Sequence, residues 1–118
     1  MAQDIAAADA LAQHVLGLGD PSVTLLNTGK FPAGWVVEYR RLLERAAEEW
    51  AEDPLWPRYM VGALHFALTH LRVRYSAWQL LDGGGRRDED TERELSQVEA
   101  PTRLFFARAF PAAEQAQG

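Results

Sequence analysis

A stripe of polar or small residues runs through positions 58–79 of this 118-residue sequence. Its members recur at steps of four and three, so on an α-helix, which turns about 100° per residue, they would share one face. Such a face carries usable chemistry, because an imidazole exchanges protons near neutral pH and a guanidinium binds phosphate or carboxylate oxygens. The stripe consists of Arg58, Gly62, His65, Thr69, Arg72, Ser76 and Gln79.

We interpret this polar stripe as the water-facing strip of a helix that is otherwise buried. Two functional alternatives stay open, an interface groove and a catalytic cleft. In a groove, Gly62 would let a partner's backbone or a ligand approach closely, although a glycine destabilises a helix relative to alanine. The remaining contacts would come from Thr69, Arg72 and Ser76.

Arg58 and His65 lie seven residues apart on the stripe, two helical turns from each other. This spacing, in the segment from Arg58 through Tyr59 to His65, is similar to the Arg-x4–6-His motif of the HEPN ribonucleases, a family of small all-helical proteins. The family tends to have a polar residue after the arginine, where this chain has Tyr59. The resemblance implies that the arginine and the histidine, brought together across a dimer, cleave RNA without a metal ion.

His70 and Arg74 lie one turn apart, on the side of the same helix that is otherwise apolar. We therefore expect both side chains to be buried. A buried guanidinium must be paired, because an isolated charge in the core is strongly destabilising. The expected partner is a glutamate of the acidic helix at 34–53 or a carboxylate of another chain, and the alternative is a carboxylate or phosphate of a ligand.

Other catalytic and metal-binding patterns are missing from the sequence. His65 and His70 would lie about 140° apart around a helix, so they are not expected to share a metal ion. Residues 83–85 are three glycines, but they lack the lysine and the preceding strand of a phosphate-binding loop. There is no cysteine, which excludes disulfides, thiolate metal sites and cysteine nucleophiles. We expect no metal and no cofactor.

Hydrophobic periodicity predicts an all-α protein, a compact antiparallel bundle of four or five helices. The central helix is expected over about residues 57–81, because it is apolar over most of its circumference. The other helices are predicted at 4–18, within 21–34, at 34–53 and at 95–110.

Charge is distributed unevenly between the two clearest helices. Residues 34–53 contain six acidic residues and three arginines, whereas residues 57–81 contain three arginines and no acidic residue. The segment between them holds Pro54 and Pro57, which predict a rigid corner. We therefore expect these helices to form an antiparallel pair with complementary charge.

Composition bounds the class of protein. The chain is 47% hydrophobic and 25% charged with a net charge of −5, which is typical of one globular domain spanning 1–118. The acidic balance argues against nucleic-acid binding. The sequence contains no run of 18 apolar residues that could span a membrane. Its N-terminus lacks the basic and apolar parts of a signal peptide. We expect a cytoplasmic protein without a membrane partner.

Two features give the reason to expect self-association. Apolar residues cover roughly 260° of the helix at 57–81, more than one neighbouring helix can cover, so a patch of it is either closed into the core or left exposed. The second feature is the C-terminal region. Pro101 predicts a kink or a break near residues 97–100, and residues 111–118 are expected to form a frayed tail. Phe105, Phe106 and Phe110 point to different sides of one helix, so Phe106 is expected on an exposed aromatic surface unless the proline reorients the last turns.

The expected function is that of a protein-interaction module without enzymatic activity, of a regulatory, adaptor or immunity type. Its partner is expected to be another protein or a second copy of the chain in a homodimer. The alternative is the ribonuclease with Arg58 and His65 as catalytic residues.

Overall fold

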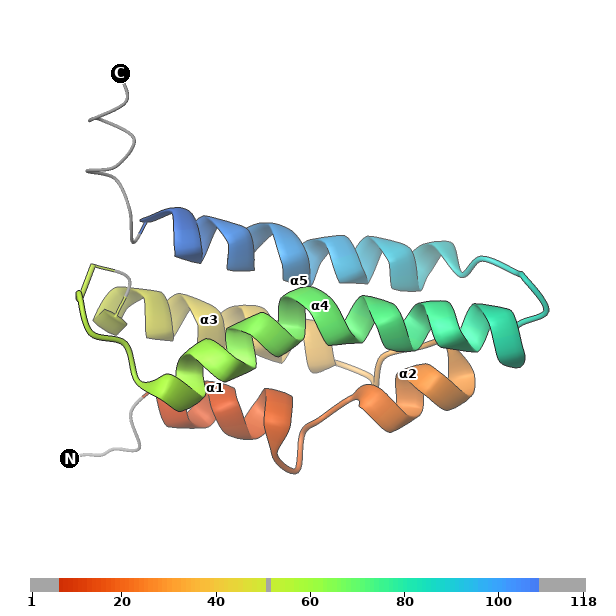
Figure 1. Cartoon of the computed structure of the whole chain (residues 1–118), viewed down its shortest axis with the longest axis horizontal. Helices are drawn as coiled ribbons and strands as arrows, with labels where there is room; N and C mark the ends of the chain where they lie inside the picture. The colour runs from red at the N-terminus through yellow and green to blue at the C-terminus, as the bar shows by residue number, and fades with distance from the viewer. Residues whose placement is uncertain (1–6, 51, 109–118) are drawn as a thin grey trace, which may run out of the picture.

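The computed structural model describes residues 7–50 and 52–108. These residues contain five α-helices and no strand (Figure 1). The all-α prediction is therefore confirmed. The predicted start of the first helix at residue 4, the predicted tail at 111–118 and Phe110 lie outside the described residues. The helices are α1 (Ala7–Leu16), α2 (Ser22–Thr28), α3 (Trp35–Trp50), α4 (Arg58–Leu81) and α5 (Glu89–Arg108).

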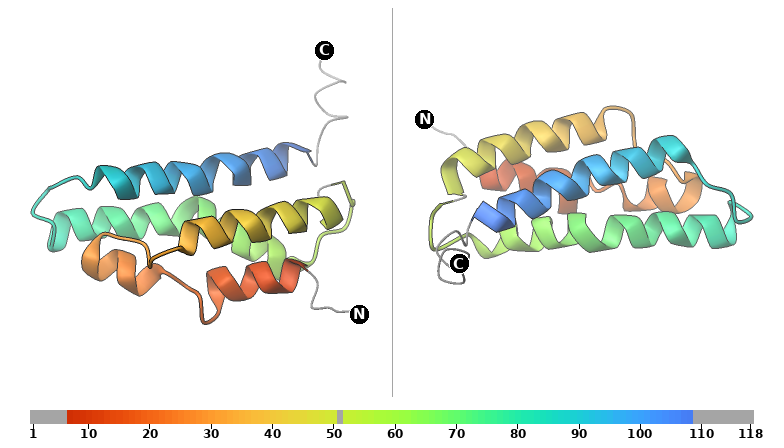
Figure 2. Two further views of the ribbon diagram at one scale, coloured as in Figure 1. Left: turned by 180° about the vertical axis from the view of Figure 1, so that it is seen from behind. Right: turned by 90° about the horizontal axis from the view of Figure 1, so that it is seen from above.

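The helices form a four-column bundle in which α1 and α2 lie end to end and share one column (Figures 1 and 2). Two short helices are needed there because α4, with 24 residues, is longer than α1 and α2 are individually. The long helices α3, α4 and α5 alternate in direction (Figure 2). Helix α4 packs against α1, α2 and α5, which confirms its central place in the bundle.

The predicted acidic–basic pair of α3 and α4 is wrong. Helix α3 packs against α1 and α5, so α3 and α4 occupy diagonal corners of the bundle (Figure 2, right). No ion pair joins α3 to α4 within the described residues. The physical reason is that apolar faces select the neighbours of a helix, whereas exposed charge pairs contribute little free energy. The two charged faces point outward in opposite directions.

The core is lined by the inward side of α4 and by aromatic side chains of α3 and α5. Tyr39, fully buried, donates a hydrogen bond to the Thr102 hydroxyl at 2.5 Å, because that hydroxyl already donates to the Val98 carbonyl at 2.6 Å. Burial raises the pKa of Tyr39, so the phenol stays protonated as the donor. This bond ties α3 to α5 across the core.

Helix α5 continues through Pro101, so of the two predicted alternatives, a kink or a break, the break is excluded. A proline removes one backbone donor and leaves the carbonyl four residues earlier unpaired. That carbonyl belongs to Gln97, an exposed residue in contact with water. Phe105 is buried against Trp56 at a ring distance of 4.9 Å, and Phe106 is half-buried at 5.5 Å from the same ring. The expected exposure of Phe106 is therefore wrong, because Trp56 covers it.

Candidate interaction surface

The polar stripe lies on the outward side of α4, as interpreted from its spacing. Six of its residues are exposed and Gln79 is partly buried. Arg72 is held by α5, because its guanidinium donates to both oxygens of the buried Glu99 carboxylate, at 2.7 and 3.0 Å. Thr69 donates to the His65 carbonyl of its own helix at 2.9 Å. The exposed residues are Arg58, Gly62, His65, Thr69, Arg72 and Ser76.

The predicted burial of His70 is wrong. Its ring is exposed and stacks on the half-buried Phe66, with ring centroids 4.7 Å apart, while Nδ1 shares a hydrogen bond with Thr69. The rings of His65 and His70 approach to 6.3 Å. The apolar side of α4 is wider than the core it faces, so its margins remain at the surface.

Arg74 is half-buried rather than buried, and no ion pair joins it to a described residue. Its predicted partner, a glutamate of the acidic helix, is on the wrong side of the molecule, because α3 lies diagonally across the bundle. Arg74 is the least exposed arginine of the described part of the chain. It lines a pocket together with residues of α2 instead.

A second periodic pattern on α4 was missed in the sequence analysis. Large apolar or aromatic side chains recur every seven residues along its edge and remain accessible, and we call this row the α4 seam. Tyr59 is 44% exposed, Val73 61% and Leu80 81%, and Phe66 is half-buried. The signal was present as the steps of seven, and the apolar arc of the helix was predicted to be wider than one neighbouring helix covers, but the exposed row within it was not located.

A pocket of about 280 Å³ opens between α2 and α4, beside the seam. The Ser22 hydroxyl at its edge is buried and has no hydrogen-bond partner. Val23, on the α2 side, is 69% exposed. We call the pocket and the α4 seam together the α2/α4 groove. The pocket is lined by Asp20, Ser22, Val23, Leu26, Phe66 and Arg74.

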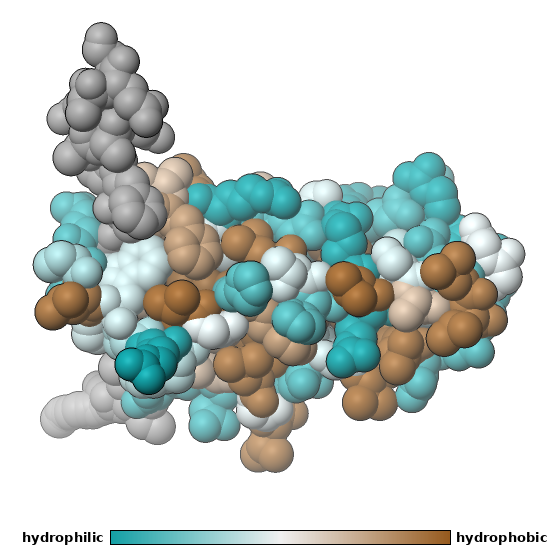
Figure 3. Space-filling view, viewed as in Figure 1, coloured by the Kyte–Doolittle hydropathy of each residue, from teal (hydrophilic) through white to brown (hydrophobic). Residues whose placement is uncertain are grey.

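Hydrophobic residues gather over α2 and over the C-terminal half of α4 in the space-filling view (Figure 3). The same surface is poor in negative charge, because neither α2 nor α4 contains an acidic residue. Asp20 is the acid that lines the pocket, and one of its oxygens accepts the Ser22 backbone N–H at 2.8 Å. The groove is therefore mostly apolar, and its pocket is lined by one cationic residue, Arg74, and one acidic residue, Asp20.

Gly62 occupies a position with open space around it. A methyl group added there would meet a single atom at ordinary contact distance, Leu16 Cδ1 at 4.0 Å. We expect Gly62→Ala to raise the free energy of unfolding by roughly 0.5–1 kcal/mol, because alanine is the better helix former. Urea unfolding followed by circular dichroism measures the change. A loss of stability would show that the glycine is needed inside the fold.

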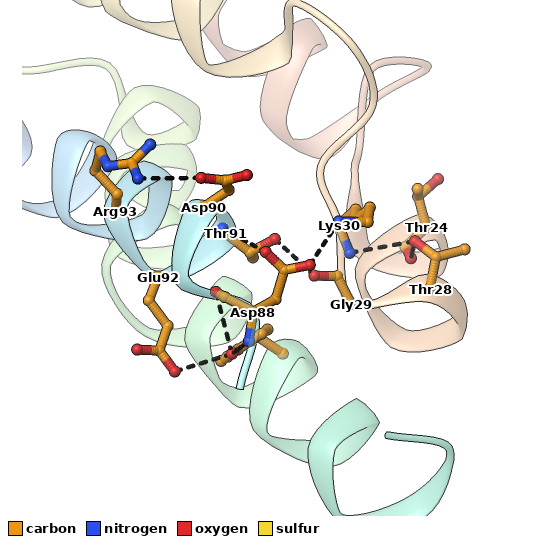
Figure 4. A network of polar contacts seen from close by, with 10 residues as sticks. Thr24, Thr28, Gly29, Lys30, Asp88, Asp90, Thr91, Glu92 and Arg93 are labelled. Atoms are coloured by element: carbon orange, nitrogen blue, oxygen red, sulfur yellow. Dashed lines mark hydrogen bonds and ion pairs between the residues drawn. The ribbon is translucent and has the colours of Figure 1, made fainter. Parts of the chain in front are cut away.

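Near the C-terminal end of α4, a polar junction joins the end of α2 to the start of α5 (Figure 4). Asp88 precedes α5 and accepts the Thr91 backbone N–H at 3.1 Å, while its second oxygen accepts from Lys30 Nζ at 2.6 Å. The Tyr75 hydroxyl accepts the Asp88 backbone N–H at 2.7 Å and donates to Glu92 at 2.9 Å. The mostly charged residues 89–94 therefore form the first turns of α5. Every one of these contacts is internal, so the junction is structural.

Asp88 can be tested as a helix cap and as an ion-pair partner separately. Asp88→Ala is expected to lower the free energy of unfolding by about 1 kcal/mol, and Asp88→Asn by less, because asparagine still caps a helix. The hydrogen bond from Lys30 lowers the pKa of Asp88. Its contribution is therefore present above the unfolded-state pKa and is lost as the pH falls through the folded-state pKa.

Urea unfolding of the wild type and both variants at about pH 7 and about pH 3 checks the Asp88 prediction. The difference between the wild type and Asp88→Asn should shrink in acid. Asp90→Asn is the matched control, because Asp90 pairs with Arg93 on the surface. A loss for Asp90→Asn as large as that for Asp88→Ala would contradict the capping role.

The fold and the groove define a small helical bundle with one open, apolar helix edge that lacks acidic residues. The sequence matches no known protein-family model, and neither a curated protein nor a solved structure is significantly similar to it. Within residues 7–50 and 52–108, no three potential ligands cluster as a metal site would require, and no helix is long and apolar enough to cross a membrane.

Proposed function

We propose that this chain is a protein-interaction module without enzymatic activity and that the α2/α4 groove is its binding surface. The observation that carries the proposal is the α4 seam, whose Val73 and Leu80 are 61% and 81% exposed on the same helix edge. Exposed apolar side chains that gather on one surface are unfavourable in water and typically mark an interaction site. A regulatory, adaptor or immunity-type role in the cytoplasm is the form of this function that we propose.

Site-specific cross-linking in the cells of origin tests this proposal. A photoreactive phenylalanine analogue is placed at Leu80 on the α4 seam or, as the matched control, at Val37, which is 75% exposed on α3. We expect a discrete covalent adduct from position 80 and none from position 37. Absence of an adduct at position 80, or the same adduct from both positions, would contradict the proposed binding surface.

The ribonuclease alternative has its own test. Arg58 and His65 are both exposed on α4, but seven residues of helix separate them by about 10.5 Å along its axis. The resemblance to the HEPN ribonucleases implies that a second copy of the chain would complete such a site. We expect RNA to stay intact with the wild type and with His65→Ala in a gel assay. Cleavage by the wild type that His65→Ala abolishes would establish the ribonuclease instead.

A further inference from the structure

The α4 seam has the spacing of a helix edge that packs against another helix. From Phe66 to Leu80, seam-facing positions follow at steps of four and three, and His70 and Ala77 lie between the members at 66, 73 and 80. This heptad pattern keeps side chains pointed at a partner helix. In this chain the flanking helices leave it uncovered, since the exposed fraction of Val73 and Leu80 rises towards the end of α4.

We propose that the α2/α4 groove binds one amphipathic helix of another protein, and that this helix carries acidic side chains beside its apolar face. The inference rests on the proposed function and specifies the class of partner. A helix laid along α4 would place apolar side chains against Phe66, Val73 and Leu80, as in other helix-in-groove complexes. Val23 on α2 forms the opposite wall.

The charge of the groove determines which polar side chains the partner helix would carry. Neither of the two helices that form the groove contains an acid, α4 contributes Arg74 to the pocket, and the half-buried Arg74 has no ion-pair partner among the described residues. A carboxylate entering the pocket would pair with Arg74 and accept a hydrogen bond from the unpartnered Ser22 hydroxyl. Asp20 lines the same pocket, but it accepts the Ser22 N–H and forms no ion pair with Arg74.

A second copy of the chain fits the groove less well. Packing α4 on α4 would bring together two helices that each carry three arginines and no acid. The acidic α3 of another copy would match in charge, but its outward side exposes one large apolar residue, Val37. It would therefore leave most of the seam in water.

An anionic membrane is also a poorer match than an acidic helix. A helix that lies on a membrane typically carries several lysines or arginines on its polar face. Helix α2 contributes no cation, Arg72 is already bound by Glu99, and the chain has a net charge of −5.

The position of Gly62, where space is open towards solvent, suits the close approach of a second helix.

Selection from a display library of 18-residue helical peptides, with the outward positions randomised, tests the class of partner. The whole chain is the bait, and enriched peptides are titrated by fluorescence anisotropy. We expect enriched sequences to combine apolar residues at steps of three and four with a negative net charge. Arg74→Gln and Val73→Asp should each weaken binding about tenfold or more.

Matched variants separate the groove from general effects. Arg45→Gln and Val37→Asp alter the same residue types on α3 and should bind as the wild type does. Gly62→Ala should fold more stably and yet bind the peptide more weakly, which a purely structural glycine would not do. All variants are first checked by circular dichroism.

Several outcomes would overturn the inference. One is an enriched pool that is cationic or unbiased in charge, and another is unchanged binding by Arg74→Gln. In both cases the proposed function stands if Val73→Asp still abolishes binding. A lack of any peptide that depends on Val73 also overturns the inference, and the cross-linking experiment then decides the proposed function separately.

Two further measurements identify other occupants of the groove. Co-sedimentation with vesicles of phosphatidylserine and phosphatidylcholine would indicate a membrane. A dimer in sedimentation velocity that Val73→Asp dissociates would indicate a second copy of the chain. Either result would overturn the assignment to an acidic helix. Because a second copy fits the groove less well and Trp56 covers Phe106, we now expect a 13.2 kDa monomer that remains in the supernatant, in place of the self-association expected from the sequence.

Discussion

Replacing Gly29 by alanine is expected to lower the free energy of unfolding by roughly 2–5 kcal/mol, from backbone strain and steric overlap together. Gly29 ends α2 with φ +71°, a left-handed conformation that residues with a Cβ atom disfavour. An added Cβ would lie 2.3–2.5 Å from three atoms of the Trp78 ring. Trp78 is itself 8% exposed and part of the core, so the ring has little room to move.

Gly29 cannot shift to relieve this overlap, because hydrogen bonds hold it on both sides. Its N–H donates to the Leu25 carbonyl at 2.9 Å, and its carbonyl accepts from the Thr91 hydroxyl at 2.7 Å. Gly34 is the matched control, since it has φ +76° with no atom within 4 Å of an added Cβ. Gly34→Ala should cost only about 1–2 kcal/mol. Equal losses in thermal and urea unfolding would contradict the Trp78 clash.

Shortening a buried side chain on the core-facing side of α4 is expected to have the other large effect on the free energy of unfolding. Leu64 is fully buried, and Leu64→Ala should cost about 2–5 kcal/mol through lost apolar burial and a residual cavity. Leu68 is half-buried, so its truncation should cost clearly less. Leu80 is 81% exposed, and Leu80→Ala should stay within about 0.5 kcal/mol.

Urea unfolding of the three leucine variants checks this order of stability loss. A cost for Leu80→Ala that matches that for Leu64→Ala would show that the outer edge of α4 is covered in the isolated chain. Such coverage would remove the basis for the α4 seam as an open surface. The same measurement therefore tests both the buried and the exposed side of one helix.

The fold was largely predictable because helical periodicity is a local property. Val15, Tyr39, Leu64 and Leu95 all lie on the predicted apolar faces and all are buried. The neighbours of each helix were not predictable in the same way, because they depend on how four columns fill space. Charge suggested that α3 and α4 are adjacent, and packing placed them diagonally instead.

The candidate site was predicted only in part. The polar stripe with Gly62 was correctly interpreted as facing water, but His70 and Arg74 were assigned to the core. Both residues lie at the margin of the apolar arc of α4, where burial depends on whether α2 covers them. Helix α2 has seven residues, and it leaves a pocket beside Arg74. No sequence pattern encodes that gap between two helices.

The diagonal placement of α3 and α4 has a consequence for the kinetics of association. Helix α4 carries three arginines and no acid, whereas α3, at the diagonal corner, carries four acidic residues and three arginines, so this charge difference contributes a dipole component directed from α3 to α4. An approaching polyanion exerts a torque on such a dipole and turns the α4 corner towards itself before contact. This orientation acts over about 10 Å at 0.1 M salt, so encounter rates should fall steeply as the ionic strength rises.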